Sequence, residues 1–230
     1  MSFNNTKRKL CVAGCSISDY TRVDRTYGEI LSENLGFEYL HEGSGCGSNA
    51  RIWRRITNHI LAGTLTENDI IIIQYTEPVR TEFWSVYPMP SYKHEGPSEE
   101  PSHNGGRILK WKMGSYTWQH YEIEKNFHRA YEKYFVNDKF SRENFTVNNF
   151  NFQHMLSNLK MKVIFNMTKR IGQFEDEIIL DCYKPLIYRD ITAAVKEYDL
   201  AENDQCHMNQ AGHEITAENL KNHILNLNLI

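Results

Sequence analysis

Two short stretches, near the beginning and near the end of the 230-residue sequence, carry side chains that could perform nucleophilic catalysis. The first is Gly14-Cys15-Ser16, and the second is Asp204-Gln205-Cys206-His207. A histidine near neutral pH can remove the proton of a serine hydroxyl, and a carboxylate on its other ring nitrogen fixes the tautomer and stabilises the imidazolium. These residue types predict Ser16 as nucleophile, His207 as its base and Asp204 as the group that orients the base.

Each stretch taken alone has a simpler interpretation. A serine between a strand and a helix commonly caps the helix, and Asp204 and His207 could lie in an ordinary surface loop. His213 is a further candidate base, but it falls inside a predicted helix, which favours a packing or surface role. Catalysis therefore requires a fold that brings both stretches to the same place.

The residues before Ser16 indicate how the serine is positioned. Residues 10–13, Leu-Cys-Val-Ala, are continuously apolar, a pattern typical of a strand buried on both faces of a parallel sheet. Gly14 permits the tight turn that must follow. Because open α/β sheets bind ligands beyond the carboxyl ends of their strands, Ser16 is expected at the ligand-binding edge.

Strand and helix patterns alternate along the rest of the chain, which predicts βαβ units with right-handed crossovers. Strands are expected at 37–40, 69–75 and 161–167, and helices at 27–35, 50–62, 116–135, 147–159, 191–198 and 210–227. Residues 178–188 are ambiguous, either a short strand or a loop with local helix. Residues 87–114 are rich in proline and glycine and are expected to form a functional loop or lid, or a disordered segment. The sequence predicts one α/β domain over residues 1–230, with a large irregular insertion at about 85–116.

The composition excludes several classes of function. It contains 40% hydrophobic and 24% charged residues, which is ordinary for a soluble globular protein, and its net charge of −3 provides no basic surface for nucleic acid or an anionic membrane. The five cysteines and the histidines lack metal-ligand spacing, and the glycine loop at 43–47 lacks a phosphate-binding pattern, so neither a metal nor a cofactor is expected. With no signal peptide or membrane-spanning run, a cytoplasmic or particle-associated protein with reduced cysteines is expected.

The order of these features resembles that of the SGNH/GDSL hydrolase family. That family places its nucleophile in Gly-Asp-Ser after the first strand, where Gly14-Cys15-Ser16 stands here, and its Asp and His in a C-terminal Asp-x-x-His, as in 204–207. Asn209 and Gly212-His213 are similar to the family's continuation into its last helix. The resemblance implies a flavodoxin-like, three-layer α/β/α sandwich with a mainly parallel five-stranded sheet in the order 2-1-3-4-5.

The resemblance also implies where an oxyanion would be held. Gly47, or Gly45, falls where the family has a glycine whose backbone N–H enters the oxyanion hole, and the N–H of Ser16 would be a second donor. The family's third block, Gly-x-Asn-Asp, is replaced by Gln-Tyr-Thr-Glu at 74–77, so its donor asparagine is missing. Since the loss of one such donor costs about 10²–10³ in rate, Asn49 is a candidate replacement, and capping of the following helix is the equal alternative.

The residues after strand 69–75 are candidates for substrate binding. Thr76, Glu77 and Arg80 are expected at the carboxyl end of this central strand. Arg80 could hold a carboxylate or an acidic sugar through a bidentate contact, but pairing with Glu77 or Glu82 to brace the loop is the commoner role of such a residue. Thr76, Gln74 and Arg80 are also weaker candidates for the missing oxyanion donor.

These features predict a serine-dependent ester hydrolase that needs no cofactor. The expected substrate is an O-acetylated carbohydrate or similar polyol, because the family often handles acetyl esters and the insertion is aromatic and polar. One alternative is a carbohydrate O-acetyltransferase that uses the same residues. A second is a catalytically inactive glycan-binding or structural module, which the altered third block favours.

Overall fold

Short apolar runs form a parallel sheet at the centre of the molecule. The computed structural model describes residues 7–20, 23–44, 47–76, 78, 81–85, 107–111, 138–166, 179–188, 191, 194, 197–198 and 207–230. The sheet's strands are β1 (Lys9–Gly14), β2 (Glu38–Gly43), β3 (Ile70–Ile73), β6 (Lys162–Asn166) and β7 (Ile187–Tyr188). They pair in the order β2-β1-β3-β6-β7, and every pairing is parallel.

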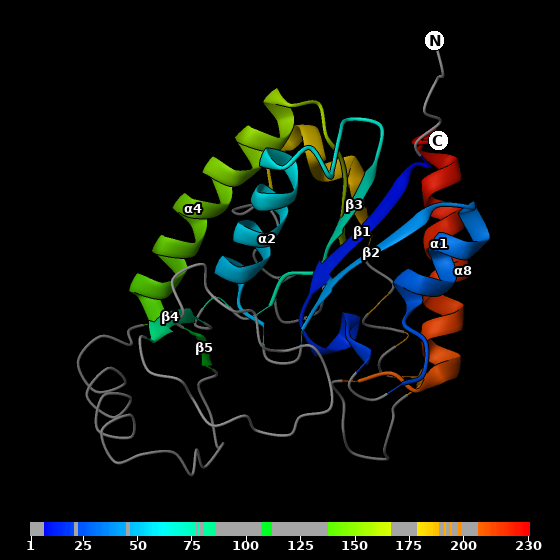
Figure 1. Ribbon diagram of the computed structural model, residues 1–230, viewed down its shortest axis with the longest axis horizontal. Coiled ribbons are helices and arrows are strands. Elements are labelled where there is room, and N and C mark those ends of the chain that lie inside the picture. The colour runs from blue at the N-terminus through cyan, green and yellow to red at the C-terminus, as the bar shows by residue number, and fades with distance from the viewer. Residues whose placement is uncertain are drawn as a thin grey trace.

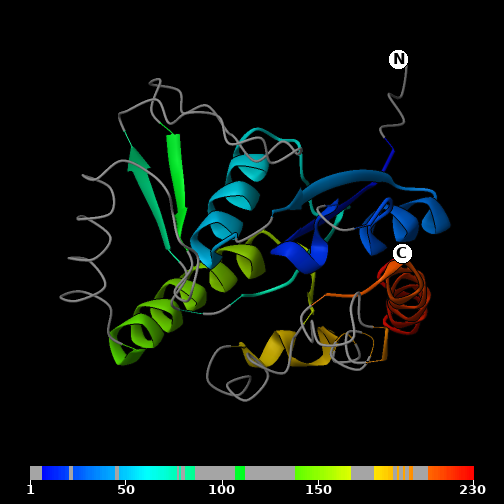
Figure 2. The ribbon, with the colours of Figure 1, turned by 90° about the horizontal axis from the view of Figure 1, so that it is seen from below.

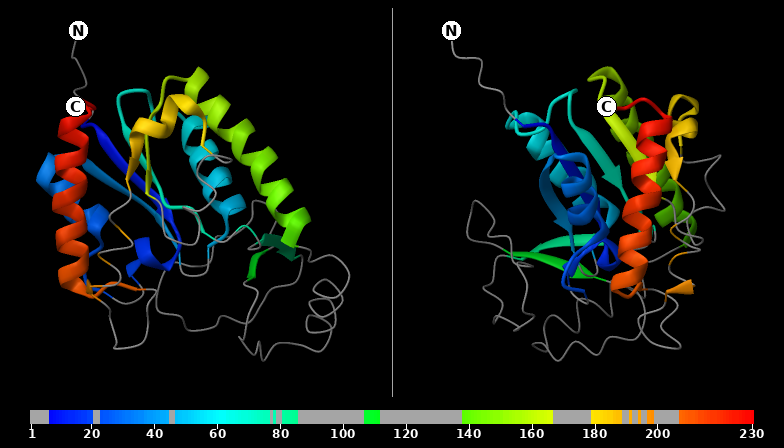
Figure 3. Two further views of the ribbon diagram at one scale, coloured as in Figure 1. Left: turned by 180° about the vertical axis from the view of Figure 1, so that it is seen from behind. Right: turned by 90° about the vertical axis from the view of Figure 1, so that its right-hand side faces the viewer.

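Helices cover both faces of this sheet. The helices α2 (Asn49–Leu61) and α4 (Asp138–Asn158) lie on one face, and α1 (Tyr27–Leu35) and α8 (Gln210–Asn226) lie on the other (Figures 1 and 3). The three-layer α/β/α class is therefore confirmed. Renumbered along the chain, the five strands also have the predicted order 2-1-3-4-5.

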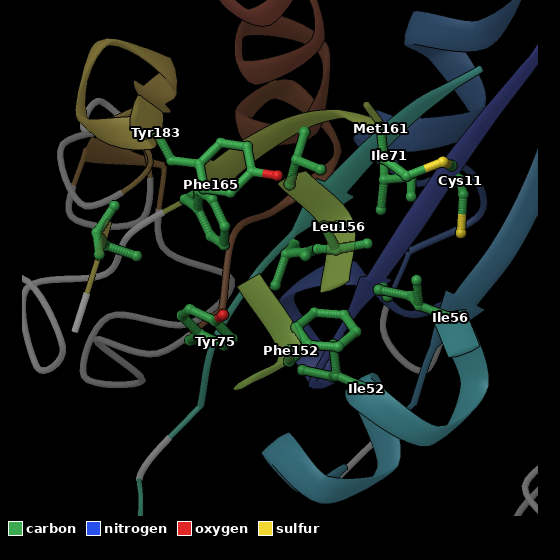
Figure 4. Packing of buried hydrophobic residues seen from close by; sticks show 14 of the residues in the cluster. Cys11, Ile52, Ile56, Ile71, Tyr75, Phe152, Leu156, Met161, Phe165 and Tyr183 are labelled. Carbon is green, nitrogen blue, oxygen red and sulfur yellow. The ribbon is translucent and has the colours of Figure 1, made fainter. Parts of the chain in front are cut away.

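The central strand β3 shows why the sheet needs both helical layers. Its four isoleucines are completely buried. Because side chains alternate along a strand, Ile71 and Ile73 pack with α2 and α4, whereas Ile70 and Ile72 pack with α1 and α8. Figure 4 shows the first of these two clusters around Ile52, Ile56, Ile71, Phe152 and Leu156.

Local signals in the sequence explain where α1 begins and ends and where α2 begins. The side chain of Thr26 accepts a hydrogen bond from the Glu29 N–H and starts α1, and Ser48 does the same for the Arg51 N–H at the start of α2. Gly36 follows α1 with φ of 71°, a conformation that favours glycine. The predicted bounds of α1 are confirmed.

The expected bounds of two other elements were wrong. Strand β2 continues to Gly43 instead of ending at residue 40, because the edge strand keeps its pairing with β1 even where its residues are polar. Helix α4 begins at Asp138 and not near 147, since its first part has no clear apolar stripe. The ambiguous segment 178–188 contains both a short 3₁₀ helix, η3 (Asp181–Leu186), and strand β7.

Part of the insertion is regular, which corrects the expectation of an irregular segment. Strand β5 (Arg107–Trp111) pairs antiparallel with β4 (Thr81–Ser85), and the pair forms a separate small sheet to the side of the main one, next to α2 (Figure 2). The prolines and glycines around 107–111 hid this strand in the sequence. The rest of the insertion and the helix expected at 116–135 lie outside the described residues, as do parts of 191–198, of which 191, 194 and 197 are helical.

Two expectations from the composition bear on the described part of the chain. Cys11, Cys15 and Cys182 are free thiols, while Cys46 and Cys206 lie outside the described residues. None of the helices within the described ranges has both the length and the apolar character needed to cross a bilayer.

Candidate active site

Ser16 lies just beyond the carboxyl end of β1, as its position in the sequence predicts. It is the first residue of a 3₁₀ turn, η1 (Ser16–Ser18), which the Ser18 N–H closes by donating to the Cys15 carbonyl at 2.9 Å. The Ser16 side chain is partly exposed, whereas Cys15 and Ser18 on either side are buried. The turn thus presents one hydroxyl at the edge where parallel sheets bind ligands.

Two glycines allow this turn to pack against the strand ends. A Cβ at Gly14 would lie 2.7 Å from Ser18 Oγ and 2.9 Å from the Gln74 side chain, and a Cβ at Gly43 would lie only 2.1 Å from the Ser18 carbonyl oxygen. Gly14 and Gly43 are also paired partners at the ends of β1 and β2. The role of Gly43 could not be predicted from the sequence, because the contact depends on the register between two strands.

His207 is held in place by the start of α8. Asn209 is the N-cap of that helix, with Oδ1 accepting from the Gly212 N–H at 3.0 Å, and its own N–H donates to the Tyr198 carbonyl at 2.7 Å. Met208, between His207 and Asn209 in the chain, is buried. His207 therefore extends from a short segment that is anchored on its carboxyl side.

The fold brings the two predicted catalytic stretches together. Nε2 of His207 lies 2.8 Å from Oγ of Ser16, although the two residues are 191 positions apart in the chain. This is the distance at which an imidazole can take a proton from a hydroxyl. Asp204, the predicted partner of the other imidazole nitrogen, lies outside the described residues.

The predicted oxyanion donors have partners within the protein. The Gly47 N–H donates to the Ser44 carbonyl at 2.9 Å, so it would bind an oxyanion only after exchanging that bond. The Asn49 amide pairs with the Thr76 backbone, Nδ2 donating to the carbonyl at 2.8 Å and Oδ1 accepting from the N–H at 2.9 Å. The capping alternative for Asn49 was wrong, because Ser48 is the N-cap of α2.

The remaining predicted substrate-binding residues divide into two groups. Thr76 lies beyond the end of β3, but only 5% of it is exposed. Glu77 and Arg80 lie outside the described residues, as does Gly45, the alternative oxyanion glycine, so their roles stay predictions. Across the described ranges, no three histidine, cysteine, aspartate or glutamate side chains are grouped to hold a metal ion.

A buried polar group beneath the serine has a role that the sequence did not indicate. Gln74 is fully buried at the end of β3; its Oε1 accepts from Ser18 Oγ at 2.7 Å and its Nε2 donates to Cys15 Sγ at 3.4 Å. Ser18 also contacts the hydroxyl of Tyr27 at 2.7 Å. The one indication in the sequence was a polar glutamine directly after four isoleucines, and it does not show which residues Gln74 contacts.

His213 packs beneath the site and is not a second base. Its Nδ1 accepts the backbone N–H of Tyr27 at 3.0 Å, and the two rings stack with centroids 5.9 Å apart. Burial, and then the charge of His207, lower the pKa of His213 from 6.5 to about 4. His213 is therefore neutral at physiological pH and satisfies one of the free donors at the start of α1. The predicted packing role is the one that these contacts describe.

A buried ion cluster supports the end of β2, next to the glycine loop. Glu42 accepts hydrogen bonds from Arg55 at 2.5 and 2.6 Å and contacts His59 Nε2 at 2.6 Å, and its backbone carbonyl accepts from Arg51 at 2.7 Å. Burial by itself would raise the pKa of Glu42, but the hydrogen bonds from His59 and Arg55 and the charges of the two arginines outweigh it and lower the pKa to about 2. Glu42 therefore stays ionised and links β2 to α2.

The fold that carries this site is similar to that of a solved protein assigned to the G-D-S-L family. The structure of a protein assigned to the lipolytic G-D-S-L family, from Desulfitobacterium hafniense DCB-2, matches with a TM-score of 0.51 at 10% identity, over 95% of this chain and 99% of that chain. At such low identity the match establishes the fold alone.

Two further solved structures are similar with TM-scores below 0.5. A lipase from a goat rumen metagenome has a TM-score of 0.48 at 13% identity, over 94% of this chain and 97% of that chain. A protein assigned as an acylhydrolase, from Bacteroides fragilis NCTC 9343, has a TM-score of 0.47 at 11% identity, over 100% of this chain and 90% of that chain. No family model and no curated protein matches the sequence. The reaction that this protein performs therefore has to follow from the geometry of its own site.

Proposed function

We propose that this protein is a serine-dependent ester hydrolase. The observation that carries the proposal is the 2.8 Å contact between Ser16 Oγ and His207 Nε2 at the carboxyl edge of the sheet. A hydroxyl that is partly exposed, bonded to an imidazole and located where parallel sheets bind ligands has the geometry of an activated nucleophile. Capping of a helix would not require the histidine.

The first half of the reaction forms an acyl-enzyme. Ser16 Oγ attacks the ester carbonyl while its proton passes to His207 Nε2, and the carbonyl oxygen becomes an oxyanion. The C–O bond to the alcohol then breaks, and the imidazolium of His207 gives the proton to the leaving alcohol. We assign Asp204 to the other nitrogen of His207, following the Asp-x-x-His pattern.

The second half repeats these steps with water. His207 takes a proton from the water, which attacks the acyl carbon, and the proton returns to Ser16 Oγ as the acid leaves. Each proton that His207 takes up is given back, so these steps need no oxidant, reductant or metal ion. Neutral His213 beneath the site adds no second positive charge when His207 becomes protonated, which favours this proton transfer.

We assign the oxyanion to the backbone N–H of Ser16 and to the second Nδ2 hydrogen of Asn49, since the first donates to Thr76. The N–H of Gly47 would join them after leaving the Ser44 carbonyl. The substrate class that we propose is an O-acetylated carbohydrate or polyol, with Thr76, Glu77 and Arg80 on the binding side. Strand β4 follows this segment in the chain, and the small sheet of β4 and β5 next to α2 is consistent with an extended ligand (Figure 2).

An inactive glycan-binding module is the second candidate, and two observations favour it. The stretch 74–77 lacks the donor asparagine of the family, and the Gly47 N–H is already bonded within the loop. Such a protein would bind an acetylated saccharide without turning it over.

Release of p-nitrophenol from acetyl to butyryl esters tests the proposal. The wild type is expected to turn over the acetyl ester, and Ser16→Ala is expected to reduce turnover to background. Ser32→Ala is a matched control, because it removes a buried serine hydroxyl that donates to the Glu29 carbonyl within α1. A folded wild type without turnover on any of these esters, together with saturable binding of an acetylated saccharide, would favour the inactive module.

Acetate release from an acetylated saccharide tests the finer assignment. Hydrolysis yields free acetate at a rate that is independent of added saccharide, whereas an acetyltransferase yields a newly acetylated saccharide and a rate that rises with the acceptor. Activity on p-nitrophenyl esters but not on any acetylated saccharide would contradict the substrate class and leave the esterase intact.

A further inference from the structure

A chain of hydrogen bonds runs beneath Ser16 and links three strand ends. The Asn166 Nδ2 at the end of β6 donates to the Tyr27 hydroxyl at 3.2 Å, and this hydroxyl contacts Ser18 Oγ at 2.7 Å. Ser18 donates to Gln74 Oε1 at 2.7 Å, and Gln74 donates to Cys15 Sγ at 3.4 Å. The chain therefore ends on the residue immediately before Ser16.

The chemistry of the groups fixes the direction of every link. An amide oxygen can only accept, so the single proton of Ser18 is committed to Gln74. Tyr27 must then donate to Ser18, while it accepts from Asn166. Burial raises the pKa of Tyr27 to about 12, although its hydrogen bonds with Ser18 and Asn166 act in the opposite sense, so the hydroxyl keeps its proton at physiological pH. Each link therefore has one donor and one acceptor and strengthens the next.

Tyr27 is the member that joins the nucleophile to the base. Its side chain is completely buried, its hydroxyl bonds to Ser18 in the turn, and its backbone N–H bonds to His213 in α8, at 3.0 Å. Helix α8 begins three residues after His207. Tyr27 therefore contacts both the turn that carries Ser16 and the helix that follows His207.

Building on the proposed function, we propose that Tyr27 is a positioning residue for the reaction, acting through Ser18 and Gln74 on the Cys15–Ser16 peptide. None of the three touches the substrate, because Tyr27, Ser18 and Gln74 are fully buried. They orient Ser16 Oγ toward His207 and the Ser16 N–H toward the oxyanion. A small displacement of a reacting atom lowers kcat and leaves the affinity for the substrate almost unchanged.

Tyr27→Phe tests this role, because it removes one hydroxyl and retains the ring. We expect kcat on p-nitrophenyl acetate to fall about tenfold with KM within about twofold. The rate at which a fluorophosphonate labels Ser16, per folded molecule, should fall by the same factor. Ser18→Ala breaks the same chain without altering the packing of α1, and it should reproduce both losses.

Tyr75→Phe is the matched control. Tyr75 is buried in the cluster that Figure 4 shows, and its hydroxyl donates to Asn149 Oδ1 on the opposite face of the sheet, so the variant loses a comparable hydrogen bond away from the turn. It should keep kcat and labelling rate. Wild-type kcat in both Tyr27→Phe and Ser18→Ala, or an equal loss in Tyr75→Phe, would overturn the positioning role. A wild type that is neither active nor labelled would overturn the proposed function itself.

Discussion

The side chain of Asn49 is paired at both ends with the backbone of Thr76, with Nδ2 2.8 Å from the carbonyl oxygen and Oδ1 2.9 Å from the backbone nitrogen. Asn49 is the first residue of α2, and Thr76 follows strand β3. The pair therefore joins the glycine loop after β2 to the segment that follows β3. Among the described residues the second Nδ2 hydrogen has no other acceptor, and it is the donor that we assign to the oxyanion.

Asn49→Ala should reduce both stability and turnover. Two buried backbone groups of Thr76 lose their partners, which should lower the free energy of unfolding by about 1–3 kcal/mol in urea titrations. Loss of the donated hydrogen should lower kcat by about 10²–10³ while KM changes little. Ser48→Ala, which removes the adjacent helix cap, should cost about 1 kcal/mol and leave kcat unchanged. Normal kcat in folded Asn49→Ala would remove Asn49 from the oxyanion site.

Gly43→Ala should displace the nucleophile turn. The new Cβ would lie 2.1 Å from the Ser18 carbonyl oxygen, so either the turn or the end of β2 must move. We expect kcat for ester hydrolysis to fall at least about 10²-fold, with a lower melting temperature. Gly36→Ala is the control, because Gly36 has φ of 71° and a Cβ added there would meet no atom within 4 Å.

Gly36→Ala should lower the free energy of unfolding by about 1–2 kcal/mol through backbone strain alone. Its kcat should remain that of the wild type. Equal turnover in the wild type and Gly43→Ala would show that the close contact is not needed for the position of Ser16.

The elements that carry their own signal could be predicted from the sequence. The apolar run 10–13, the four isoleucines of β3 and the span from Thr26 to Gly36 each contain the pattern or the cap that determines them. The contact between Ser16 and His207 could also be predicted, because the two stretches occur together in an order that resembles that of the SGNH/GDSL family.

The supporting contacts could not be predicted in the same way. Gln74 binds Ser18 and Cys15, and Gly43 contacts Ser18, only because three strands end in one register. Tertiary contacts of this kind leave no periodic trace in the sequence. The sequence left two roles open for Asn49 for the same reason. Only the structure shows that Ser48 caps α2, so that the Asn49 side chain can pair with Thr76.

Stability should decline below pH 6.5 because of His213. Its pKa is about 4 in the folded protein against 6.5 ordinarily, so the unfolded chain binds the proton first. The contribution is complete above pH 6.5 and is lost as the pH falls to 4, and its upper size is on the order of 3 kcal/mol. His213→Asn retains an acceptor for the Tyr27 N–H. In this variant the urea midpoint should depend less on pH between pH 4 and 6.5 than in the wild type. An unchanged slope would contradict the assignment.

Glu42 should govern stability at still lower pH. Its pKa of about 2 lies below the ordinary 4.5, so its contribution is complete above pH 4.5 and is lost as the pH falls toward 2. Glu42→Gln leaves buried arginines without their carboxylate and should cost about 3–5 kcal/mol at pH 7 in urea titrations.

Glu33→Gln is the control for Glu42, because Glu33 pairs with Arg25 and both side chains are exposed. It should cost less than about 1 kcal/mol. Comparable losses in the two variants would mean that the cluster around Glu42 is no stronger than a surface ion pair.

Covalent labelling of Ser16 tests the central claim most directly. Folded wild-type protein is treated with a fluorophosphonate, and the modified peptide is identified by mass spectrometry. The contact between Ser16 and His207 predicts one phosphonyl group on Ser16, none in Ser16→Ala and far slower labelling in His207→Ala. Folded wild-type protein that stays unlabelled, or that is labelled at another residue, would contradict Ser16 as the nucleophile.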